Sequence, residues 1–227
     1  MISEMFAHGF IQRAFIGGVL VSLCAALLGV SLVLKRYSMI GDGLSHVSFG
    51  ALSIAIALGF APIKFSIPIV IIAAFFLLRL AENGKMKSDA AIAMVSASSL
   101  AIGVIVTSLT TGLSTDVCSY MFGSILAMSK DDVIFSVVLS VVVLIMFGFC
   151  YHRIFAVTFD ESFSKATGVK VGMYNTLISI FTAVTVVLGI KMMGAMLISS
   201  LIIFPALTSM RVFKSFLSVT ICSAILA

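Results

Sequence analysis

The chain contains a series of apolar runs long enough to cross a lipid bilayer, and this feature constrains its fold more than any other. The longer runs have about 15 to 21 residues, which as helices span or nearly span a hydrocarbon core of about 30 Å. Their apolar residues occupy every face, whereas a membrane β-barrel would alternate polar and apolar residues in short strands. Because 61% of the residues are hydrophobic and only 10% are charged, the sequence predicts an all-α, polytopic transmembrane helical bundle.

We expect about eight spans, the last of them truncated, in a single transmembrane domain that covers residues 1–227. The last apolar run starts near Phe216 and stops at Ala227, which is too short to cross a bilayer at about 1.5 Å per residue. We therefore expect a C-terminal part beyond residue 227. The complete runs cover residues 14–34, 44–60, 65–80, 90–109, 133–151, 173–190 and 194–208.

The Lys and Arg residues predict which ends of the spans face the cytoplasm, because cytoplasmic connections carry an excess of positive charge. With the N-terminus outside, ten of the 14 Lys and Arg residues fall in inner segments, which favours this orientation. The inner ten are Lys35, Arg36, Arg79, Lys85, Lys87, Arg153, Lys165, Lys170, Arg211 and Lys214, and the outer four are Arg13, Lys64, Lys130 and Lys191.

The charge and cysteine patterns do not indicate a nucleic-acid-binding protein, a zinc knuckle or a disulfide-rich protein. The net charge of +5 comes from basic residues scattered between apolar runs, so the sequence does not predict a nucleic-acid partner. The four cysteines lie far apart without CxxC spacing, which predicts neither a zinc knuckle nor a disulfide framework. We expect most of the chain to be embedded in membrane lipid.

The motif GDGLSH, residues 41–46, places the carboxylate of Asp42 and the imidazole of His46 four residues apart. On a helix these side chains are neighbours, about 5 to 6 Å apart at Cβ, and can point at one site. Their oxygen and nitrogen donors suit zinc, manganese or iron(II), and two copies of the chain would supply four ligands. The structural alternative is that Asp42 caps a helix beginning at Gly43 while His46 hydrogen-bonds a neighbouring helix.

The inner connection 151–172 contains the sequence TFDESFSKATG, which predicts a short helix over about 158–168. Thr158 and Glu161 form a capping-box pair at its start, and Gly168 is a C-terminal stop. Phe159, Phe163 and Ala166 recur at helical spacing, which fits either a helix lying in the lipid headgroups or a knob that docks a cytoplasmic partner. The outer connection 110–132 has an apolar middle, 120–128, that fits a re-entrant or interfacial helix.

Four segments resemble successive signatures of the membrane subunit of bacterial ABC transporters that import zinc, manganese or iron. They read KRYSMIGDGLSHVSFGALSIA, SYMFGSIL, FDESFSKATGVKVGMYN and GIKMMGAMLISSLIIFPALTSMR, and the first of them is the most specific. The resemblance runs from about Phe6 to Lys214, nearly the whole chain.

The resemblance implies a permease of the bacterial cytoplasmic (inner) membrane that forms a homodimer. It also implies two further partners, a cytoplasmic ABC ATPase subunit and an extracytoplasmic metal-binding protein. Asp42 and His46 would line the metal path. The helix over about 158–168 resembles the coupling helix that sits in the ATPase, and its residues Phe159, Asp160, Glu161, Phe163 and Gly168 would make that contact.

These observations predict a transport subunit and not an enzyme. The sequence has no G-x-x-x-x-G-K-[ST] motif, so ATP hydrolysis is expected in a separate ATPase. HExxH is absent, and a nucleophile elbow around Ser45 fails because Val47 stands at its second glycine. We expect Zn²⁺, narrowly ahead of Mn²⁺, as the transported substrate and no permanently bound cofactor. The alternative is a proton-coupled secondary transporter that uses Asp42 and His46.

Overall fold

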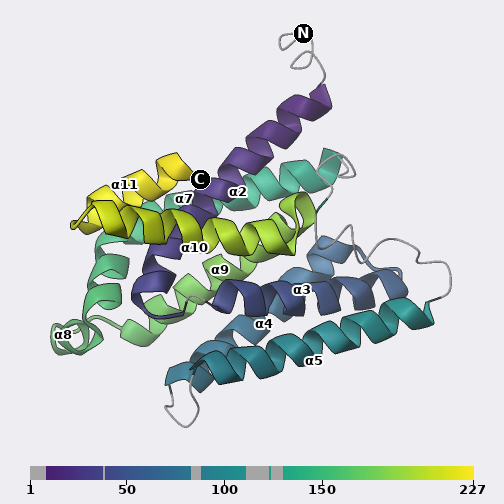
Figure 1. Cartoon of the computed structure of the whole chain (residues 1–227), viewed down its shortest axis with the longest axis horizontal. Helices are drawn as coiled ribbons and strands as arrows, with labels where there is room; N and C mark the ends of the chain where they lie inside the picture. Colours follow the sequence, from purple (N-terminus) through teal and green to yellow (C-terminus); the bar gives the residue numbers. More distant parts are fainter. Residues whose placement is uncertain (1–8, 38, 83–87, 111–122, 124–129) are drawn as a thin grey trace.

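The computed structural model describes residues 9–37, 39–82, 88–110, 123 and 130–227, and every regular element in these residues is a helix. The predicted all-α bundle is confirmed (Figure 1). The helices are α2 (Gly9–Leu34), α3 (Ile40–Ala57), α4 (Pro62–Glu82), α5 (Ser88–Leu109), α7 (Lys130–Phe159), α8 (Glu161–Ala166), α9 (Val171–Met193), α10 (Ala195–Val212) and α11 (Phe216–Leu226).

Each predicted apolar run overlaps one of these helices. Six of them, α2, α3, α5, α7, α9 and α10, are long and apolar enough to cross a membrane, while α11 and the apolar part of α4, Pro62–Leu77, are shorter. The run 44–60 ends as a helix at Ala57 because Gly59, with φ of 73°, turns the chain. The predicted apolar segment 120–128 lies outside the described residues apart from Gly123.

Helix α9 forms the centre of the bundle. It packs against α2, α3, α4, α7 and α10, and every residue from 181 to 190 is buried. A helix that is apolar on all sides is stable only when neighbours or lipid cover it. By contrast, only 17% of the α5 span and 28% of the α10 span are buried, as expected of helices that face lipid on one side.

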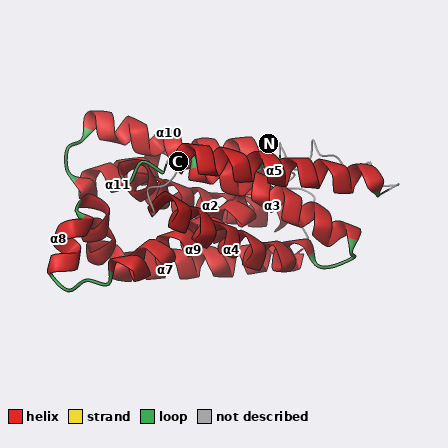
Figure 2. Cartoon of the chain, turned by 90° about the horizontal axis from the view of Figure 1, so that it is seen from below, coloured by secondary structure: helices red, strands yellow, loops and turns green. Residues whose placement is uncertain are grey.

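The helices alternate in direction, so the connections gather at two ends of the bundle. Helix α8 lies at one end, on the left of Figures 1 and 2, together with the α2–α3 and α10–α11 turns. The α3–α4 turn lies at the opposite end. We refer to these as the α8 end and the far end. The excess of Lys and Arg predicts that the α8 end faces the cytoplasm.

Glycines allow α3 and α2 to lie close to their neighbours. A Cβ added to Gly50 of α3 would lie 2.8 Å from the carbonyl oxygen of Ser99 in α5. A Cβ on Gly29 of α2 would collide with the carbonyl oxygen of Ile202 in α10. Small residues at such positions let the backbones of membrane helices approach one another. The close packing fixes α5 beside α3, the helix that carries Asp42 and His46, and α10 beside α2.

Candidate functional site

Asp42 is a residue of the first turn of α3 and does not cap that helix. The helix begins at Ile40, its N-cap is Met39, and the Met39 side chain makes no capping hydrogen bond. The alternative in which Asp42 caps a helix beginning at Gly43 is therefore wrong, because the helix starts three residues earlier. Asp42 is therefore free to point away from the helix end, along the side of α3 that also carries His46.

The side chains of Asp42 and His46 lie one turn apart on the same side of α3, as the motif predicts. The His46 Nε2 atom is 3.8 Å from the Asp42 Oδ2 atom. Two ligand atoms bound to one transition metal at about 2.0 to 2.2 Å are at most about 4.2 Å apart, so one ion can bridge this gap. The side chains are 26% exposed for His46 and 47% for Asp42, so the pair is accessible to an ion.

The pair faces the side of α3 that lies between α5 and α10. Gly41 contacts α10 and Gly43 contacts α5, as the neighbours of their added Cβ atoms show. Successive residues of a helix point about 100° apart, so Asp42 points between these two neighbours, and His46 follows it one turn later. Ser45 marks the α10 boundary of this side, because its hydroxyl lies 3.3 Å from a hydroxyl of α10.

Within the described part of the chain, no group of three or more His, Cys, Asp or Glu side chains is placed to hold a metal ion. The pair therefore offers two protein ligands from one copy of the chain. Two ligands leave most of the coordination shell of a transition metal open to water or to a second protein surface. Such a site suits brief binding and release better than permanent retention.

The predicted inner helix is present as α8, with a different start. The side chain of Asp160 caps it, since its Oδ1 atom accepts a hydrogen bond of 2.9 Å from the Phe163 N–H. The predicted start at Thr158 is wrong, because Thr158 is buried in the last turn of α7 and the chain becomes extended only at Asp160. Asp160 thus takes the capping function that we assigned to Thr158.

The predicted stop at Gly168 is confirmed. Gly168 has a φ of 81°, in the left-handed region that favours glycine. Its N–H bonds the Lys165 carbonyl at 3.1 Å, and the Val169 N–H bonds the Ser164 carbonyl at 2.9 Å. This pair of bonds is a Schellman motif, which ends α8 and sets the direction toward α9.

Phe159 and Phe163 are two exposed aromatic side chains at the α8 end. Phe159 is 70% exposed and Phe163 is 64% exposed. The Phe159 ring also packs on Phe155 of α7, with 5.5 Å between the centroids. The aromatic side chains that the sequence assigns to a docking or headgroup contact are therefore accessible, and Asp160 between them is exposed as well.

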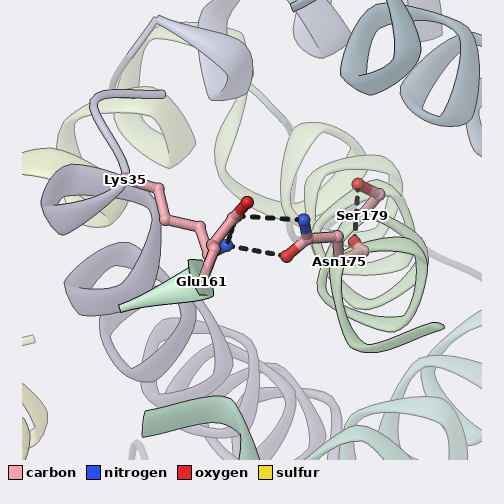
Figure 3. Close-up of polar contacts among 4 residues, drawn as sticks. All are labelled: Lys35, Glu161, Asn175 and Ser179. Atoms are coloured by element: carbon pink, nitrogen blue, oxygen red, sulfur yellow. Dashed lines mark hydrogen bonds and ion pairs between the residues drawn. The ribbon is translucent and has the colours of Figure 1, made fainter. Parts of the chain in front are cut away.

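Glu161 makes its contacts with the bundle instead. Its Oε1 atom lies 2.6 Å from the Lys35 Nζ atom and accepts a 3.1 Å hydrogen bond from the Asn175 Nδ2 atom. The Lys35 ammonium also donates to the Asn175 Oδ1 atom at 2.7 Å, which closes a triangle of side chains (Figure 3). Sequence reasoning did not predict the contacts of Lys35 and Asn175 with Glu161; the only local signal was an amide at the start of an apolar run.

The charge of Glu161 is favoured by this arrangement. Partial burial of the carboxyl by itself raises its pKa, and the hydrogen bonds from Lys35 and Asn175 together with the charges of Lys35 and Lys165 lower it by more. The net result is a pKa for Glu161 below its ordinary value. The contact of α8 with the bundle is therefore an ionic one at neutral pH.

Comparisons with known proteins agree with this architecture. A sequence profile of the ABC 3 transport family matches residues 7–227. The high-affinity zinc uptake system membrane protein ZnuB of Buchnera aphidicola is 32% identical over 196 residues, 86% of this chain and 75% of the relative. The manganese import system permease protein ScaB of Streptococcus gordonii is 28% identical over 217 residues, 96% of this chain and 78% of the relative.

A solved structure, PsaBC from Streptococcus pneumoniae in complex with Fab, has the same fold. Its TM-score is 0.84 with 28% sequence identity, and the match covers 99% of this chain and 82% of that chain. The likeness extends over nearly the whole chain, including α3, the helix that carries the Asp42 and His46 pair.

The lowered pKa of Glu161 predicts a pH-dependent contribution to stability. Because the folded pKa is lower than the unfolded one, this contribution is complete above the ordinary value of 4.5 and is lost as the pH falls through the folded pKa. The melting temperature of the purified protein in detergent should exceed that of Glu161→Gln at pH 7, and the difference should shrink on acidification below about pH 4.5. A difference that stays constant from pH 7 to pH 3 would contradict the ionic contact.

Proposed function

This chain belongs to the ABC 3 transport family, and from that membership we propose that it is the membrane-spanning permease subunit of an ATP-driven importer of divalent transition metal ions. It is a multi-pass membrane protein, and the membrane is the cytoplasmic (inner) membrane of a bacterium. The metal ion is the substrate that passes through the bundle. The whole chain supports the fold and the family. The chemistry of metal binding depends on one pair of side chains, Asp42 and His46.

The Asp42 and His46 pair is the observation that carries the proposal. A carboxylate and an imidazole 3.8 Å apart are a suitable pair of donors for one transition metal ion. Ionisable residues within membrane helices are costly, so they are kept mainly where they bind or move ions. Partial exposure on the side between α5 and α10 leaves room for a second copy of the chain to cover the pair and add its own two ligands.

We propose zinc as the substrate, ahead of manganese and iron. Imidazole nitrogen suits zinc well, whereas manganese accepts a shell of carboxylate and water oxygens more readily. One similar protein is named for zinc uptake and another for manganese import, so family membership does not choose between the two metals. The choice of zinc therefore depends on His46 and on whichever further ligands complete the shell.

The energy for transport comes from a separate ATPase subunit in this proposal, because the chain itself carries no phosphate-binding loop. The exposed rings of Phe159 and Phe163 at the α8 end are the surface that this subunit would bind. An extracytoplasmic binding protein would deliver the metal at the far end. Closure of the ATPase pair then moves α8 and rocks two permease copies around the metal site between outward-open and inward-open states.

Replacement of Asp42 or His46 by alanine should abolish metal uptake. Each change removes a direct ligand, and loss of even an outer-shell partner of a metal site typically costs about 10-fold to 100-fold. Uptake of radioactive zinc is measured in proteoliposomes that contain the permease and its ATPase, with and without ATP. His152→Ala is the matched control, since His152 is an exposed histidine of α7 and should leave uptake unchanged.

Near-normal uptake by both alanine variants would overturn the metal site. Uptake that persists without ATP and collapses with the proton gradient would instead support the proton-coupled alternative. Immunoblots of the membrane fraction check that each variant is inserted at the normal level.

Replacement of Phe159 and Phe163 by serine should release the ATPase. The two rings supply the exposed apolar area at the α8 end, and buried aromatic side chains contribute most strongly to such contacts. Co-purification of the ATPase with the tagged permease measures the effect, which we expect to be a loss of at least about tenfold in retained ATPase. Phe60→Ser is the matched control, because Phe60 is similarly exposed but lies in the turn at the far end. Intact co-purification and uptake would identify α8 as a helix of the lipid headgroup layer.

A further inference from the structure

Lys35 lies at the C-terminal end of α2 with its side chain only 6% exposed. An ammonium group buried to this extent is stable only when it is paired and hydrogen-bonded. Its two partners belong to different helices, because Glu161 is the first residue of α8 and Asn175 lies in the first turns of α9. One side chain therefore joins the ends of three helices (Figure 3).

The triangle is anchored on the centre of the bundle. Asn175 is 2% exposed, and its backbone carbonyl accepts a 3.1 Å hydrogen bond from the Ser179 hydroxyl one turn further along α9. Loss of any one member leaves a buried polar partner without its bond. Glu161 is the outermost member, with 40% of its side chain exposed, so a displacement of α8 acts on the triangle through Glu161.

The chain that follows Lys35 connects α2 directly to α3. The Arg36 N–H bonds the Val33 carbonyl at 3.0 Å and the Tyr37 N–H bonds the Leu32 carbonyl at 2.9 Å, so α2 ends in a tight turn. Arg36 has a φ of 61°, a left-handed conformation that is unusual for a residue with a side chain. The Ile40 N–H then bonds the Tyr37 carbonyl at 3.0 Å, which connects this turn to the first residue of α3.

We propose that Lys35 is a positioning residue that transmits the movement of α8 to the Asp42 and His46 pair. A displacement of α8 is passed from Glu161 to Lys35, and the hydrogen-bonded turn at Arg36 passes it to the first turn of α3, where Asp42 lies. This inference rests on the proposed function and adds to it the route by which the ATPase acts on the metal site. Residues of the docking surface and residues of the transmission route are different in this arrangement.

The separation of docking from transmission follows from the different contacts of three side chains at the α7–α8 junction. Phe159 and Phe163 are exposed and are the residues proposed to meet the ATPase. Glu161 lies between them in the sequence and binds Lys35 and Asn175 instead. A Lys35 variant should therefore still bind the ATPase. Movement of the ATPase should no longer be transmitted to Asp42 and His46 in that variant.

The test compares wild type, Lys35→Met and Glu161→Gln as full complexes with the ATPase in proteoliposomes. Three quantities are measured on each preparation, namely retained ATPase, ATP hydrolysis and zinc uptake. We expect retained ATPase and hydrolysis near wild-type levels, and uptake per ATP lower by about fivefold or more, the lower range of typical coupling between sites. Lys170→Met is the matched control, since it removes an exposed cation at the same end and should leave uptake per ATP unchanged.

A double variant tests whether Lys35 and Glu161 act as one unit. Lys35→Met combined with Glu161→Gln should lower uptake per ATP no further than the more affected single variant, because each change already breaks the same contact. Additive losses would overturn the proposed route. Release of the ATPase by both single variants would also overturn it, because the network would then serve docking.

A structural readout distinguishes transmission from a general loosening of the fold. Spin labels at Lys165→Cys in α8 and Met39→Cys before α3, both exposed positions, report the distance across the network. On addition of ATP the distance distribution should stay narrow in the wild-type background and broaden in Lys35→Met. The melting temperature of Lys35→Met should stay within a few degrees of wild type. A distance distribution unaffected by Lys35→Met would contradict the inference.

The proposed function and the further inference fail in different ways. Absence of ATP-driven zinc uptake in wild type, or normal uptake by Asp42→Ala, contradicts the proposed function. When wild type takes up zinc and Asp42→Ala does not, normal uptake per ATP in both Lys35→Met and Glu161→Gln contradicts only the route through Lys35.

Discussion

The hydrocarbon core offers no water to polar groups, and this constraint determines which polar side chains the bundle tolerates. Many serine and threonine hydroxyls bond the carbonyl four residues earlier, as Ser45 does with Gly41 at 2.7 Å and Ser53 does with Phe49 at 2.9 Å. The buried Lys35 is held by two partners. Against this background Asp42 and His46 form an ionisable, partly exposed pair within a span, and the binding of an ion accounts for a pair that packing alone does not require.

The Asp42 and His46 pair and helix α8 are far apart in the sequence but lie toward the same end of the bundle (Figure 1). Both are at the α8 end, because α3 starts there and α8 closes that end (Figure 1). His46 is the seventh residue of α3, which places it about 9 Å along the helix from its start. In our proposal a short and largely hydrogen-bonded route, through Glu161, Lys35 and the turn at Arg36, is therefore enough to relate ATPase movement to the metal ligands.

Sequence patterns predicted the features that depend on local chemistry. The apolar runs correctly predicted the positions of the helices, and Gly168 correctly predicted the end of α8. The start of α8 was wrong because Thr158 and Asp160 are both competent caps, and the choice depends on how far α7 extends. The alternative start of α3 at Gly43 was wrong for a different reason, since the turn after α2 already begins α3 at Ile40. The contacts of Lys35 with Asn175 join residues 140 positions apart, and no local pattern contains such a pairing.

The most direct test of the metal site is the coordination shell of the bound ion. X-ray absorption at the zinc edge, recorded on the purified permease loaded with zinc, reports imidazole scattering separately from the oxygen shell. We predict an imidazole contribution that disappears in His46→Ala while carboxylate and water oxygens remain at about 2.0 to 2.2 Å. An identical spectrum in the wild type and in His46→Ala would show that the ion binds elsewhere, and would contradict the assignment of this pair as the metal site.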